Sequence, residues 1–91
     1  MAGFPFKQKK INENTLLREF DANVNNEELI WHRDARDRQI IVVESDGWQL
    51  QMDNNLPVAL LEGQTYQISA GEYHRVIKGR GKLLVVVKEN D

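Results

Sequence analysis

The sequence predicts an all-β domain, built as an antiparallel sandwich or barrel. After residue 27 the chain becomes a series of short runs rich in strand-forming residues, including QIIVVES, WQLQMD, TYQIS, YHRVI and KLLVVVK. Turn residues separate these runs at close intervals, which is typical of antiparallel sheets rather than of alternating strands and helices. Asp46-Gly47 and the GRG segment at residues 79–81 each predict a hairpin between the runs that flank them.

The chain has the size of one domain. Its 91 residues can bury about 60–65% of the surface of the unfolded chain, which is enough for a single modest core. We expect an N-terminal arm over residues 1–13 and one β-barrel domain over residues 14–91. Leu16, Leu17 and Phe20 have helical spacing behind Asn14 as a cap, so residues 14–22 are expected to form a short helix, with an edge strand as the alternative.

Composition argues against several kinds of partner. The formal charge of −2 arises from 12 basic and 14 acidic residues spread along the chain, which disfavours nucleic acid or a membrane surface. Disulfides and thiolate sites are excluded because the chain has no cysteine. No apolar run approaches the roughly 20 residues that span a bilayer, and the N-terminus lacks the apolar segment of a signal peptide. We therefore expect a cytoplasmic protein.

A candidate metal site begins in the segment IWHRD. On a strand, His32 and Asp34 leave the same face together with Ile30, and that face is expected to point inward. Burying an imidazole and a carboxylate without partners costs several kcal/mol, whereas a bound cation satisfies both. His74 is the only other histidine, so it alone can complete a set of two histidines and one carboxylate, which leaves coordination positions open.

A purely structural interpretation of these residues competes with the metal site. A single histidine on a strand is more often a hydrogen-bonded structural residue than a ligand. Asp34 has arginines within reach as surface ion-pair partners, namely Arg36, Arg38 and Arg75.

Over roughly residues 26–88 the sequence resembles the cupin superfamily. Gly63, Gly71 and His74 fall at the spacing of the second cupin motif, with Ser69 in the proline place and Lys78 in the asparagine place. The resemblance implies a small single-domain cupin, a double-stranded β-helix of the jelly-roll type.

The first cupin motif matches from His32 onward. Asp34 takes the place of the second histidine and Gln39 that of the glutamate, while Asn26 and Asp46 stand at the two glycine places. Metal-binding cupins typically use three histidines and one glutamate, so the resemblance implies the ligand set His32, Asp34, Gln39 and His74. Gln39 is a weak neutral donor that can serve outside the coordination sphere. Fe(II) fits these ligand types best, followed by Mn(II), Ni(II) and Zn(II).

The resemblance implies two classes of function. The first is a metal-dependent enzyme with dioxygenase-like or isomerase-like activity on a small polar molecule, although no general base is identifiable. The second is a non-catalytic module that binds a sugar or another small ligand and has a degenerate metal site. Trp48, Tyr66 and Arg75 are candidate substrate contacts, while Trp48 also fits a place in the core because it alternates with Leu50. Small cupins usually form homodimers, and we expect one here.

Overall fold

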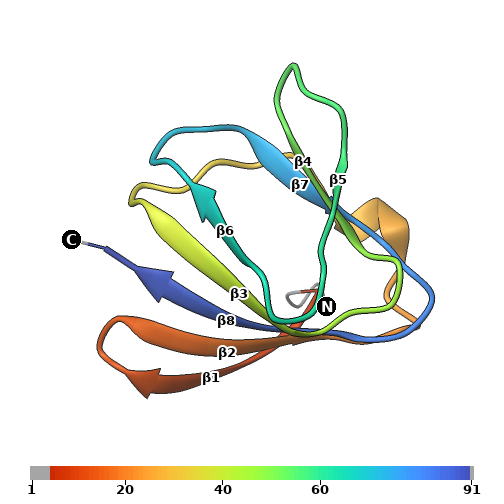
Figure 1. The fold of residues 1–91 in the computed structure, drawn as a ribbon, viewed down its shortest axis with the longest axis horizontal. Helices are drawn as coiled ribbons and strands as arrows, with labels where there is room; N and C mark the ends of the chain where they lie inside the picture. Colours follow the sequence, from red (N-terminus) through yellow and green to blue (C-terminus); the bar gives the residue numbers. More distant parts are fainter. Residues whose placement is uncertain (1–4, 91) are drawn as a thin grey trace.

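The computed structural model describes residues 5–90, which form two antiparallel sheets that curve around a common interior (Figure 1). The larger sheet has the order β1-β2-β8-β3-β6 and consists of Lys7–Asn12 (β1), Thr15–Phe20 (β2), Leu83–Glu89 (β8), Arg38–Glu44 (β3) and Thr65–Ile68 (β6). The smaller sheet has the order β5-β4-β7 and consists of Val58–Ala59 (β5), Gln49–Met52 (β4) and His74–Ile77 (β7). The predicted all-β barrel is confirmed.

The helix predicted over residues 14–22 is wrong, because Thr15–Phe20 is strand β2. It pairs with β8 along its whole length, from Thr15 opposite Lys88 to Phe20 opposite Leu83. Pairing with a distant strand overrides the local helical spacing. The edge of the sheet is instead β1, an exposed strand that lies within the predicted N-terminal arm. Residues 1–4 of that arm lie outside the described residues.

The two predicted hairpins are also wrong, because each turn connects one sheet to the other. β3 and β4 flank Asp46-Gly47 and β7 and β8 flank residues 79–81, yet neither pair of strands is hydrogen-bonded. Gly47 has a φ of +80° but Asp46 is not in the left-handed region, so the turn lacks the positive φ at both central residues that a type I′ hairpin needs. The two corners pack together, since the Arg80 amide donates to the Asp46 carbonyl at 2.8 Å.

The strand predicted around residues 28–34 is reduced to a single bridge. A short 3-10 helix, η1 (Asn26–Glu28), comes first, and the Asn25 side chain caps it by accepting a hydrogen bond from the Glu27 amide at 3.0 Å. Beyond it, only His32 pairs with another strand residue, His74. This segment therefore brings a histidine of a connecting loop up to the start of β7.

The core lies between the sheets and contains apolar side chains of both. Trp48 on the corner before β4 is fully buried, and its indole Nε1 donates to the Gly81 carbonyl at 2.8 Å. The buried apolar side chains are Phe20, Val24, Leu29, Val42, Trp48, Leu50, Leu60, Ile68, Leu83, Val85 and Val87. In residues 5–90 no helix has the length and apolar character needed to cross a membrane.

Candidate metal centre

His32 and His74 are brought together by the backbone. The amide of each donates to the carbonyl of the other at 2.9 Å, so the two residues lie directly opposite each other in antiparallel register. Side chains at such a pair leave the same face. The two imidazole rings accordingly lie with their centroids 4.3 Å apart, with His74 buried and His32 exposed at the mouth of the interior.

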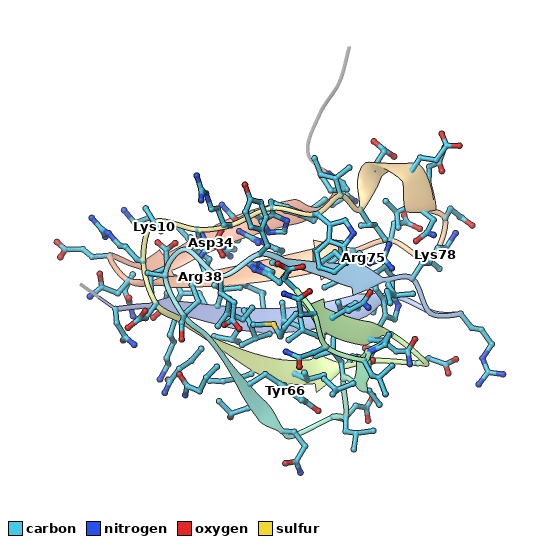
Figure 2. All side chains as sticks on the ribbon, turned by 90° about the horizontal axis from the view of Figure 1, so that it is seen from above. Lys10, Asp34, Arg38, Tyr66, Arg75 and Lys78 are labelled. Carbon is cyan, nitrogen blue, oxygen red and sulfur yellow. The ribbon has the colours of Figure 1, made fainter. Side chains whose placement is uncertain are left out.

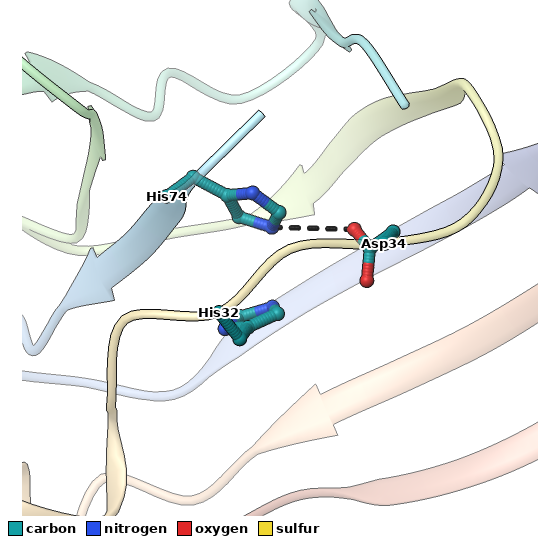
Figure 3. A group of neighbouring side chains, drawn as sticks. All are labelled: His32, Asp34 and His74. Atoms are coloured by element: carbon teal, nitrogen blue, oxygen red, sulfur yellow. Dashed lines mark ion pairs between the residues drawn. The ribbon is translucent and has the colours of Figure 1, made fainter. Parts of the chain in front are cut away.

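Asp34 completes the group because it is two residues beyond His32 and shares its face. Its Oδ2 lies 3.4 Å from Nε2 of His74 (Figure 3). The Gly71 amide donates to the Asp34 carbonyl at 2.8 Å, which ties this loop to the turn before β7. One ligand atom of each of His32, Asp34 and His74 lies within 4.8 Å of the others, so the three side chains predicted from the sequence converge.

Both imidazoles are oriented by backbone carbonyls two residues earlier in the chain. Nδ1 of His74 lies 2.9 Å from the Glu72 carbonyl, and Nδ1 of His32 lies 3.0 Å from the Ile30 carbonyl. Because a carbonyl can only accept, each Nδ1 carries the proton and each Nε2 presents a lone pair. This is the arrangement that fixes the tautomer of histidines that bind metals.

The three side chains therefore present acceptors to one another. Burial lowers the pKa of His74 from its ordinary value, against the opposing effects of the Glu72 hydrogen bond and the Asp34 charge, so the imidazole is neutral at pH 7. Oδ2 of Asp34 is buried and accepts no hydrogen bond within residues 5–90. A cation bound between these acceptors would satisfy both of them. Two imidazoles and one carboxylate fit a divalent transition-metal ion.

Arg38 is the functional candidate that the sequence interpretation missed. Its Nη1 lies 3.3 Å from Oδ1 of Asp34, and its Nη2 lies 2.6 Å from Oε2 of Glu89. Arg38 lines the interior cavity and Gln39 does not, because neighbouring residues of β3 point to opposite faces. The sequence contains a pattern that could have identified Arg38. The first cupin motif allows three or four residues between its second histidine, here Asp34, and its glutamate, and a spacing of three places Arg38 at the glutamate.

A cavity of about 560 Å³ opens beside the candidate metal centre. The side chains of His32, Asp34, Arg38 and His74 form one part of its lining, and Arg18 and Glu28 contribute further charges. The other lining residues are apolar and come from both sheets and from the loops, namely Pro5, Phe6, Phe20, Leu29, Ile30, Ile40, Leu50, Leu60, Ile68, Val76, Leu83, Val85 and Val87.

The three side chains predicted as substrate contacts do not line this cavity. Trp48 belongs to the core. The Tyr66 hydroxyl donates to the Ala59 carbonyl at 2.8 Å and accepts from the Leu61 amide at 2.9 Å, so it fastens the connection between β5 and β6. Nε of Arg75 donates to Gln51 at 2.9 Å, and its guanidinium stacks on Trp31. In Figure 2 Asp34 and Arg38 lie side by side, whereas Tyr66 and Arg75 lie elsewhere.

Comparison with known proteins finds similarity at the level of structure alone. No protein-family model and no curated protein matches the chain. A cupin-2 domain protein from Shewanella frigidimarina superposes with a TM-score of 0.65 at 16% identity, over 99% of this chain and 84% of that protein.

Two structures of enzymes are also similar. A structure of the DMSP lyases RdDddP and RnDddQII has a TM-score of 0.71 at 18% identity and covers 85% of this chain. Fe(II)-HppE has a TM-score of 0.63 at 18% identity and covers 84%. The chain spans 37% of the length of the lyase and 41% of that of HppE. These likenesses confirm the predicted architecture: the chain has the cupin fold.

Proposed function

We propose that this protein binds a divalent metal ion through His32, Asp34 and His74 and is a metal-dependent enzyme acting on a small molecule. The observation that carries the proposal is the convergence of three acceptors, with Oδ2 of Asp34 buried and without a hydrogen bond. The similarity of fold to Fe(II)-HppE supports a divalent ion, and the ligand types favour Fe(II) over Mn(II), Ni(II) and Zn(II).

The surrounding residues give this site the features of a reaction centre. His32, Asp34 and His74 would hold the ion with three protein ligands, and a bound ion would supply Lewis acidity or redox chemistry. The Ile30 and Glu72 carbonyls hold the imidazoles in one tautomer. Arg38 orients the Asp34 carboxylate through Oδ1 and leaves Oδ2 directed at His74. The reaction is dioxygenase-like or isomerase-like by resemblance.

The alternative is a non-catalytic module that binds a small ligand such as a sugar without an ion. The contact between Arg38 and Asp34 favours this alternative, because the guanidinium supplies positive charge to the same carboxylate that a metal would need. A cytoplasmic location and a homodimer also stay predictions from the sequence.

Metal analysis separates the two functions. We expect protein purified without added metal, or stripped with EDTA and titrated with each of the four ions, to hold about one ion per chain. His32→Ala should abolish stoichiometric binding, and because His32 is exposed this substitution spares the core. Asp53→Asn, which removes an exposed carboxylate directly after β4 that does not belong to the group of three, is the matched control and should bind as wild type does.

A wild-type protein that retains no ion, and whose melting temperature does not change with any of the four, would exclude the metal site. The non-catalytic alternative would then be preferred. Circular dichroism of each variant confirms that a loss of binding does not reflect a loss of fold.

A further inference from the structure

Arg18 is an arginine on the inward face of the larger sheet. Strand β2 alternates, so Arg18 shares its face with Leu16 and Phe20, and both of these apolar residues pack in or against the core. Arg18 pairs with Val85 of β8, which is itself buried. The guanidinium lines the same cavity as His32, Asp34 and His74. An arginine at this position is unusual, because burying an apolar side chain there would be more favourable than partly burying a charged one.

Neutral groups hold the Arg18 guanidinium in place. Its Nε and Nη2 donate to Oε1 of Gln8 at 3.0 and 2.7 Å. The charged group also stacks on the Phe6 ring, 4.0 Å from the ring centroid. These contacts fix the plane of the guanidinium and leave Nη1 for a further acceptor. None of the ion pairs formed within residues 5–90 includes Arg18.

The ion pairs around the cavity are unevenly distributed. Arg38 contacts two carboxylates, Asp34 and Glu89, whereas no ion pair within residues 5–90 includes Arg18. Burial and the nearby charge of Arg38 lower the pKa of Arg18 to about 10, against the opposing charges of Asp34 and Glu89, so Arg18 stays protonated at pH 7. A partly buried guanidinium whose direct contacts are neutral groups favours the binding of an anion, and a carboxylate matches its planar geometry.

The rest of the cavity favours an apolar ligand body. Its volume of about 560 Å³ falls within the range of small-molecule sites, which combine apolar walls with a few oriented polar groups. We propose that the cavity binds a small organic carboxylate with an apolar chain, whose carboxylate contacts Arg18 and whose chain packs on the apolar walls. This inference deepens the proposed function and rests on it for the role of the ligand, which would be the substrate of the metal centre.

Calorimetric titration with hexanoate and with hexanamide tests the inference. The two probes have the same chain and differ in charge. The protein is kept in EDTA, so a carboxylate cannot bind through a metal. We expect hexanoate to bind at least about tenfold more tightly, as for a hydrogen bond to a charged group. Arg18→Gln should remove this preference and Arg18→Lys should keep part of it. Arg80→Gln, which removes an exposed arginine, should leave the preference unchanged.

Three results would overturn the inference: equal affinity of the wild-type protein for both probes, no binding of hexanoate at millimolar concentration, or a preference that survives in Arg18→Gln. The first two results are measured on the wild-type protein, so they test the inference even if a variant misfolds. If the protein binds no metal but still prefers hexanoate, the carboxylate site is supported and the proposed metalloenzyme function is refuted.

Discussion

Replacing Gly79 by alanine should destabilise the protein strongly, because the two inter-sheet corners leave no space for a methyl group. A Cβ at Gly79 would overlap the Asp46 carbonyl oxygen and lie 2.6 Å from both the backbone nitrogen and the ring Cδ1 of Trp48. Two of these atoms belong to the backbone and the third to a fully buried ring, so none can move cheaply. Overpacking of this kind costs about 1–3 kcal/mol.

The displacement would also strain the hydrogen bond from the Trp48 indole to Gly81, which contributes about 1 kcal/mol. A total loss of about 3 kcal/mol corresponds to a fall in melting temperature of roughly 12–24 °C for a domain of this size. Gly81→Ala is the matched control, because its Cβ would lie 3.3 Å from Cβ of Asp46, a close contact that a small shift relieves, whereas the contacts at Gly79 are much shorter. Thermal unfolding followed by circular dichroism measures both variants. Equal melting temperatures for the two variants would refute this account of the corner.

Two further predictions concern the site itself. The pKa of His74 is lowered in the folded, metal-free protein. Below the ordinary histidine pKa of about 6.5, the unfolded chain therefore binds a proton at this residue more readily than the folded chain does. The free energy of unfolding of wild type, relative to that of His74→Gln, should therefore be greatest above that pH and should fall on acidification by at most about 1.4 kcal/mol per pH unit. Urea unfolding at pH 7.5, 6.5 and 5.5 measures this difference. A difference that does not change with pH would contradict the prediction. Arg38→Gln should raise the affinity for a divalent ion about tenfold, because a positive unit charge near the ion costs on the order of 1 kcal/mol of binding free energy even at high dielectric. Competition with a fluorescent chelator measures this affinity, and an unchanged or weaker affinity would contradict the prediction.

The parts of the structure that follow from local rules were predictable from the sequence. Alternation places His32 and Asp34 on one face, and the spacing of Gly71 and His74 identifies the second half of the site. The strand at residues 15–20 was not predictable in this way. Leu16 and Phe20 satisfy both helical and strand periods, and only the pairing with β8, far along the chain, decides between them.

Long-range geometry also decides which residue joins the site from β3. The first cupin motif allows Arg38 or Gln39 in the glutamate place, and only the strand pleat shows that Arg38 faces the cavity. The same limit applies to the corner at Asp46-Gly47. The residues of this corner predict a turn. Whether the turn joins two paired strands or two different sheets depends on the strands with which β3 and β4 pair, and these lie elsewhere in the chain.

The position of Arg38 links the metal site to the proposed carboxylate site. A glutamate there would lower the positive charge of a bound ion, whereas Arg38 adds to it, even though Glu89 balances part of its charge. An ion held by one carboxylate with Arg38 beside it would therefore be more electron-poor than one held with a glutamate in that place, which would weaken its binding and strengthen its Lewis acidity. Once an ion is bound, an anion in the cavity would offset part of the charge that the ion adds, so ion and anion should each favour the binding of the other by the same factor.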